Sequence, residues 1–213
     1  MMQEERNYLE LKIPISQNAE WLSNLCDAMA KEGIYVKWQN GWYHITVMFI
    51  YDNKHVKELQ SAFDKILDNH EVPVMCLGEL GVFTTRGGQQ HVVYLTSSKA
   101  SMEVTSLIEC LRGEAKSIGA NIDPDFRLHI SLGRIDAHAY SIEQVQTIIE
   151  KIKVPDFAID INEAEYRYFR GDSIQRWQIK KQTDFAYCSA YHPNAEAILR
   201  LSKIHESLID NRE

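Results

Sequence analysis

Apolar and polar residues alternate in several stretches of the chain, and between these stretches they follow a helical period. Alternation over residues 7–13 predicts a half-buried strand, which Pro14 ends. The same reasoning predicts further strands at residues 34–38, 42–51, 72–83, 91–96, 127–134, 157–169 and 173–182. Apolar residues at helical spacing predict helices at residues 17–32, 52–69, 101–118 and 141–152, and another in the tail from Pro193.

The predicted strands and helices follow one another with no long linker between them. Such an order is typical of a mixed α/β (α+β) fold, and it predicts two lobes with a groove between them. Asn40-Gly41 is a strong signal for a two-residue hairpin, so we expect the strands at 34–38 and 42–51 to pair. A polar, glycine-bearing loop at 84–90 is well suited to reach over a ligand.

Two of the predicted strands carry a histidine that is followed two positions later by a hydroxyl residue. The first motif is His44-Ile-Thr46, and the second is His129-Ile-Ser131. Residues two apart on a strand share a face, so each histidine is expected beside its own Thr or Ser. A histidine within an apolar strand is costly to desolvate, so it needs a buried partner or a wet cleft.

Two such strands side by side would gather two imidazoles and two hydroxyls around one point. This set suits phosphoryl chemistry, in which one imidazole takes a proton, the other gives one, and hydroxyls bind the phosphate oxygens. Histidine fits both roles because its unperturbed pKa is about 6.5. The bare pattern also arises by chance, as His205-Glu-Ser207 in the predicted tail helix shows. Two structural histidines therefore stay open as the alternative to a paired site.

Composition and charge limit the classes of binding partner and the cellular location that we expect. A net charge of −7 argues against wrapping a long nucleic acid, although a small anion or a single RNA end still fits. The polar, acidic first residues do not resemble a secretory signal, and no apolar run reaches the roughly 18 residues of a membrane span, so we expect a cytoplasmic location. No C-x-x-C or His-Glu-x-x-His motif is present, so we expect no metal and reduced thiols at Cys26, Cys76, Cys110 and Cys188.

The two motifs resemble the duplicated His-x-Thr/Ser signature of the two-histidine phosphoesterase superfamily. The surrounding residues are similar to its bacterial 2′,5′-RNA ligase-like branch, which includes RNA 2′,3′-cyclic phosphodiesterases. The similarity covers about residues 7–185, and its further points are Ile13-Pro14, Val36-Lys37-Trp38, Gly81-Val82-Phe83 and Phe126 to Arg134. The resemblance implies a bilobal fold with an approximate internal twofold axis, in which two antiparallel-rich sheets flanked by helices surround a central groove.

Carried over residue by residue, the resemblance implies that His44 and His129 are the acid and base pair and that Thr46 and Ser131 bind the phosphate. We assign His129 as the base and His44 as the acid, an order that the sequence does not fix.

Two arginines are further candidates for substrate binding. Arg134 matches an arginine that often follows the second motif, and it shares a face with the motif only if the strand ends or bulges near Gly133. Arg86 in the polar loop could contact a ribose or a phosphate, with a solvated loop arginine as the alternative.

The resemblance implies a phosphodiesterase without cofactor that acts on a small nucleotide or RNA end carrying a cyclic phosphate or a 2′,5′ linkage, and that could show 2′,5′-RNA ligase-like activity. No membrane or long duplex partner is expected. A non-catalytic nucleotide or RNA-end sensor of the same fold is the alternative, and a metal hydrolase is disfavoured. We expect one bilobal domain over residues 1–190, a helical tail at 191–213, and a monomer or weak dimer.

Overall fold

The computed structural model describes residues 6–16, 19–97, 101–169 and 171–180 of the chain. The predicted tail helix and the end of the predicted 1–190 domain therefore lie outside the described residues. The described elements are β1 (Asn7–Ile13), α1 (Glu20–Lys31), β2 (Lys37–Trp38), β3 (Tyr43–Ile50), α2 (Val56–Asp68), β4 (Val74–Thr84), β5 (Gln90–Ser97), α3 (Met102–Ile118), β6 (Ile130–Asp136), α4 (Ile142–Ile149), β7 (Phe157–Asp160), β8 (Glu163–Tyr168) and β9 (Ser173–Gln178).

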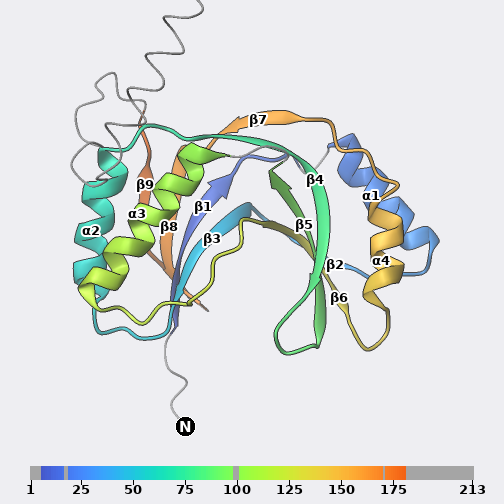
Figure 1. Ribbon diagram of the computed structural model, residues 1–213, viewed down its shortest axis with the longest axis horizontal. Coiled ribbons are helices and arrows are strands. Elements are labelled where there is room, and N and C mark those ends of the chain that lie inside the picture. Colours follow the sequence, from blue (N-terminus) through green and yellow to red (C-terminus); the bar gives the residue numbers. More distant parts are fainter. Residues whose placement is uncertain (1–5, 17–18, 98–100, 170, 181–213) are drawn as a thin grey trace, which may run out of the picture.

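The strands form two antiparallel sheets. The first sheet has the order β3-β1-β8-β9, and the second has the order β2-β6-β5-β4-β7. Helices α2 and α3 lie against the first sheet, and α1 and α4 lie on the side of the second (Figure 1). The predicted α+β architecture of two sheets flanked by helices is therefore confirmed. No helix in the described ranges is long and apolar enough to cross a membrane.

The predicted hairpin at Asn40-Gly41 is wrong. Gly41 has a φ of 97°, so the chain does turn here as the glycine allows. The flanking strands nevertheless diverge, because β2 pairs with β6 in the second sheet and β3 pairs with β1 in the first. A turn signal fixes a local reversal of the chain, whereas the pairing partner is chosen by which faces each strand must bury.

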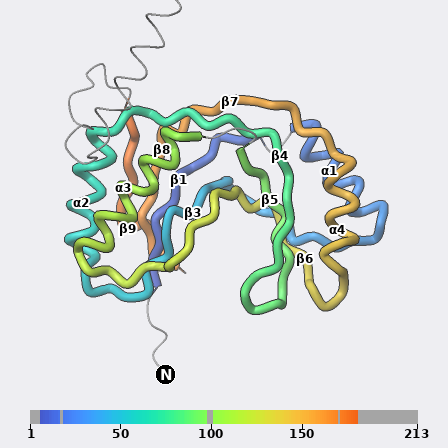
Figure 2. The backbone as a smooth tube through the Cα atoms, viewed as in Figure 1, coloured from blue at the N-terminus to red at the C-terminus, as the bar shows by residue number. Residues whose placement is uncertain are grey.

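The predicted strand at residues 157–169 is two strands in different sheets. Strand β7 pairs with β4, whereas β8 pairs with β1 and β9, so the chain crosses from one sheet to the other between them (Figure 2). Ile161, at the crossing, is fully buried and continues the apolar pattern. For this reason the pattern alone did not reveal the break.

Local signals placed most helix ends correctly. Gly119 ends α3 in the left-handed conformation with a φ of 90°, and Ser141 begins α4 with a complete capping box. The predicted start of a helix at Asp52 was wrong, because α2 begins at Val56. The Asp52 carboxylate instead accepts a hydrogen bond of 3.0 Å from the Lys54 backbone in the turn before the helix.

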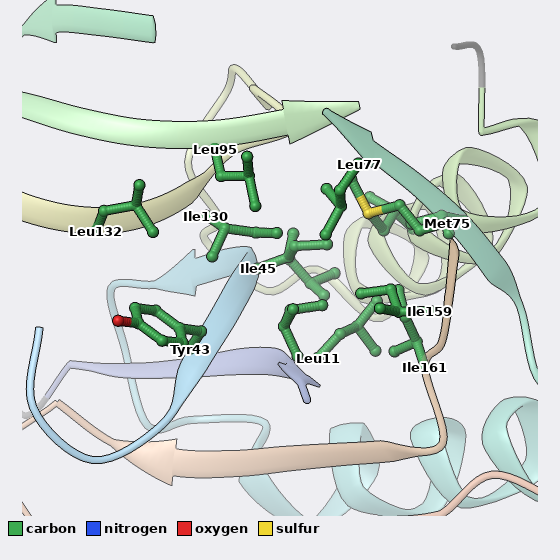
Figure 3. Close-up of a cluster of buried hydrophobic side chains, with 14 of the residues drawn as sticks. Leu11, Tyr43, Ile45, Met75, Leu77, Leu95, Ile130, Leu132, Ile159 and Ile161 are labelled. Atoms are coloured by element: carbon green, nitrogen blue, oxygen red, sulfur yellow. The ribbon is translucent and has the colours of Figure 1, made fainter. Parts of the chain in front are cut away.

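Apolar side chains from both sheets meet in one buried cluster (Figure 3). Leu11 and Ile45 of the first sheet and Leu77, Leu95 and Ile130 of the second are all 0% exposed. Burying a side chain of this size contributes about 1.5–3 kcal/mol, so the cluster holds the two sheets together. It also fixes β3 relative to β6, the strands associated with the two histidine motifs, and these two strands are in contact.

Candidate active site

His44 lies on the polar face of the first sheet. The register of β1 and β3 places Lys12 opposite His44 and Glu10 opposite Thr46. Opposite residues of an antiparallel pair share a face, so these four side chains lie together. The residues on either side of His44 in the chain are buried. The strand therefore presents its histidine and its threonine on one face, and its apolar residues on the other.

His129 lies one residue before β6, so this strand begins three residues later than the predicted start at residue 127. The backbone carbonyls of the two residues before His129 accept hydrogen bonds from side chains and not from a neighbouring strand. The Thr96 hydroxyl donates to the Leu128 carbonyl over 2.9 Å, and Nδ1 of His129 lies 2.8 Å from the Arg127 carbonyl. When Nδ1–H donates to that carbonyl, Nε2 keeps its free lone pair. The Phe83 ring packs edge-on against the imidazole with centroids 5.2 Å apart.

A β-bulge in β6 brings Arg134 to the face of Ser131. The register of β5 and β6 pairs Tyr94 with Ser131 and Val92 with Arg134, with a shift between Val93 and Tyr94. Because Tyr94 and Val92 share a face of β5, their partners do so as well. The bulge that Arg134 needs to share a face with Ser131 is therefore present. Nη1 of Arg134 donates to Gln90 Oε1 over 3.2 Å.

A pocket of about 200 Å³ lies beside this bulge. One of its lining residues, Lys37, is a basic residue that the sequence did not mark as a site residue. Its lining residues are Lys37, Trp38, Gln39, Ser131, Gly133 and Arg134. Lys37 lies opposite Arg134 in the β2–β6 pair, and neither side chain forms an ion pair with another described residue. Like charges opposite each other destabilise a sheet, so this pair is suited to bind an anion.

Both histidines are shifted toward the neutral form. Burial lowers the pKa of His44 below its usual value, with Glu10 opposing this shift and Lys12 and His129 adding to it. Burial also lowers the pKa of His129, assisted by Arg127 and Arg134. Strand β3, which carries His44, contacts strand β6, which begins one residue after His129, and His129 adds to the lowering of the His44 pKa. The structure therefore brings the two motifs together from distant parts of the chain.

Arg86 is not joined to either histidine by any contact among the described residues. The Arg86 side chain is 81% exposed, and its guanidinium forms an ion pair with Asp125, which lies in the segment that leads to His129. An exposed pair of this kind is worth about 0–1 kcal/mol, so Arg86 can exchange its carboxylate for a ligand at little cost.

Cys26, Cys76 and Cys110 form no disulfide with one another in the described ranges, and Cys188 lies outside these ranges. Within the same ranges, no group of three or more His, Cys, Asp or Glu residues is arranged to hold a metal ion.

Comparison with known proteins finds similarity at the level of the fold. No protein-family model and no curated protein matches the sequence. Usb1 of Kluyveromyces marxianus superposes with a TM-score of 0.57 at 7% identity over 84% of this chain and 100% of that chain. A phosphoesterase structure gives 0.54 at 16% identity, covering 84% and 99% of the two chains. E. coli LigT with 3′-AMP gives 0.53 at 18% identity, covering 83% and 99%. The fold expected from the resemblance is thus confirmed.

Proposed function

We propose that this chain is a metal-independent phosphodiesterase that acts on 2′,3′-cyclic phosphate ends of RNA or nucleotides, or on 2′,5′ phosphodiester bonds. One observation carries the proposal. Strand β3, which carries His44 and Thr46, contacts strand β6, which carries Ser131 and begins one residue after His129. The fold, which is shared with a solved phosphoesterase, supports the same reaction class.

His129 is the general base in this mechanism, and His44 is the general acid. His129 is neutral at pH 7 because its pKa is lowered, and its Nε2 takes a proton from the attacking water. The water oxygen bonds to phosphorus, one ring P–O bond breaks, and Nε2 of His44 gives its proton to the leaving ribose oxygen. Each proton transfer contributes about 10²–10⁴ in rate. If a 5′-hydroxyl takes the place of the water, the same two groups in the same roles would support ligase-like joining: the 5′ oxygen bonds to phosphorus, the bond between phosphorus and the 3′ oxygen breaks, and a 2′,5′ linkage remains.

The phosphate is held by one hydroxyl from each sheet and by two cations from the second sheet. The hydroxyls of Thr46 and Ser131 donate hydrogen bonds to non-bridging oxygens, and Arg134 and Lys37 neutralise their charge. Arg86 is a further candidate from the polar loop. Proteins of this fold bind small nucleotides, since Usb1 has been solved with uridine monophosphate and LigT with 3′-AMP.

An aromatic surface beside His44 supports a nucleoside substrate. The rings of Tyr8, Phe49 and Phe169 lie with centroids 6.0–6.3 Å apart, and Tyr8 also lies 6.4 Å from the His44 ring. Phe169 is 50% exposed, so its face is open to a ligand. Stacking of a base on an aromatic ring is worth about 1–3 kcal/mol.

Hydrolysis of a nucleoside 2′,3′-cyclic phosphate in the presence of a chelator tests the proposal. The wild type should turn the substrate over, whereas His44→Ala and His129→Ala should each lose about 10²-fold or more and remain folded. His138→Ala, at an exposed position, is the matched control and should keep full activity. Full activity in either motif variant would contradict the mechanism. Inhibition by the chelator would indicate a metal enzyme, and tight nucleotide binding without turnover would indicate a sensor.

A further inference from the structure

Glu10 is a buried carboxylate beside His44 that the acid and base mechanism does not use. Its side chain is 0% exposed. Its Oε1 accepts hydrogen bonds from the indole N–H of Trp42, over 2.9 Å, and from the Lys12 ammonium. Its Oε2 lies 3.6 Å from Nδ1 of His44, and neither of these two buried atoms has a hydrogen-bond partner among the described residues. The two unpaired atoms therefore face each other.

A proton on Nδ1 of His44 would satisfy both atoms at once. A charge-assisted hydrogen bond between nitrogen and a carboxylate is about 2.7–2.9 Å long, so a small rotation of either side chain closes the gap. Catalytic hydrogen bonds are often long in the absence of substrate and shorten when it binds. The Trp42 backbone also favours the charged form of His44, but its carbonyl lies outside hydrogen-bond geometry with Nδ1. Glu10 is thus the better acceptor for Nδ1–H.

The positive charge of Lys12 is shared between two carboxylates. Its ammonium contacts Glu10 and, over 2.5 Å, Glu165 of β8. Burial alone would raise the pKa of Glu165, but hydrogen bonds from Lys12, Ser173 and Arg176 lower it to about 2. Glu165 also pairs with Arg176, over 3.1 Å, so it does not depend on Lys12 alone. Both donors to Glu10, Lys12 and Trp42, contact Oε1, and Oε2 is left for His44.

The other groups around His44 do not replace Glu10. Tyr8 lies on the same strand as Glu10, and burial raises its pKa to about 12, so it is neutral. Arg167 of β8 lies beside Glu165, at 3.9 Å, and over the Trp42 ring. His129, one residue before β6 of the second sheet, disfavours the charged form of His44. Glu10 is the carboxylate that approaches the imidazole.

We propose that Glu10 is a positioning residue that accepts a hydrogen bond from Nδ1–H of His44, directs Nε2 toward the reacting phosphate and stabilises the imidazolium. This inference rests on the proposed function and deepens it, because it assigns His44 as the acid. His129 donates Nδ1–H to the neutral backbone carbonyl of Arg127, and no carboxylate among the described residues forms an ion pair with it, which suits the base.

The test compares Glu10→Gln with Glu165→Gln, a matched variant that removes the other carboxylate of Lys12 without touching His44. In Glu10→Gln, the pKa of His44 followed by ¹⁵N NMR should fall, and kcat at pH 7 should decrease by about tenfold or more with KM little changed. Glu165→Gln should leave the His44 titration in place and kcat within about threefold. An unchanged His44 titration in Glu10→Gln, or equal losses in both variants, overturns the proposal.

A measurement on the wild-type protein covers the case in which Glu10→Gln fails to fold. The neutral form of His44 should carry its proton on Nδ1, which the ¹⁵N shifts of the imidazole report directly. A proton on Nε2 instead would overturn the role of Glu10. Both NMR readouts are independent of turnover, so they also separate a failure of this inference from a failure of the proposed phosphodiesterase activity.

Discussion

Arg112 of α3 links the first motif strand, β3, to the segment that leads to His129, so its removal should affect both stability and the site. The residue is 6% exposed. Its Nη1 donates to the Val47 carbonyl of β3 over 2.8 Å, and its Nη2 donates to the Asp123 carbonyl over 2.6 Å. The Asp123 carboxylate, 3.3 Å from Nη1, in turn accepts from the Phe49 backbone over 2.7 Å. This network anchors the segment that leads from α3 to His129.

The structure sets the size of the effect of Arg112→Met. The variant keeps the length of the side chain but takes this donor from the buried Val47 carbonyl, from the partly buried Asp123 carbonyl and from the Asp123 carboxylate, which is 19% exposed. Removing one partner of a buried ion pair costs about 3–5 kcal/mol. Each kcal/mol lowers the melting temperature of a domain of this size by about 2–4 °C, so the loss should be about 6–20 °C.

Calorimetry of Arg112→Met measures this loss, and Arg86→Met is the control because it removes an ion pair that is almost fully exposed. The control should unfold within about 1 kcal/mol of the wild type. Turnover measured well below the melting temperature should fall in Arg112→Met, because the segment before His129 loses its anchor. A melting temperature within error of the wild type would refute the reasoning.

Three further predictions concern the site. Burial lowers the pKa of both His44 and His129, so the protonated form of the acid is lost as pH rises through the lowered pKa of His44. The pH–rate profile should therefore peak below about pH 6.5, and activity that still rises above pH 7 would contradict this. Lys37→Met should raise KM by about tenfold with little change in kcat and should weaken the salt dependence of KM, which steady-state kinetics at two ionic strengths will show. In Gly81→Ala the new Cβ would lie 2.3 Å from the Tyr94 ring, so the ring must move. We expect the free energy of unfolding to fall by about 1–3 kcal/mol, measured by thermal unfolding, and kcat to decrease; no change in either would be inconsistent with the packing.

Local patterns in the sequence predicted which residues share a face but not which strands are neighbours. Alternation placed β1 and the β4–β5 pair correctly, and it predicted that Arg134 needs a bulge to reach the face of Ser131. Pairing was mispredicted at Asn40-Gly41, because a glycine turn is compatible with strands that diverge into separate sheets.

The role of Glu10 could not be predicted either, because the sequence pattern does not show which strands lie beside β1. A Glu-x-Lys pair within an apolar strand, as at Glu10 and Lys12, signals a polar face. Only the register of β1 with β3 and β8 shows that this face holds His44 and a second carboxylate. Lys37 was likewise part of the resemblance, but its position opposite Arg134 became visible only with the β2–β6 pairing.

The interleaved path of the chain has a consequence for its synthesis. Strand β1 lies between β3 and β8, so one of its edges stays unpaired until residues near the end of the described chain leave the ribosome. The polar face that carries His44 therefore cannot be completed by an N-terminal fragment. Contacts between such distant residues slow folding, and an exposed strand edge favours aggregation in the meantime. We expect the nascent chain to depend on chaperones until β8 is available.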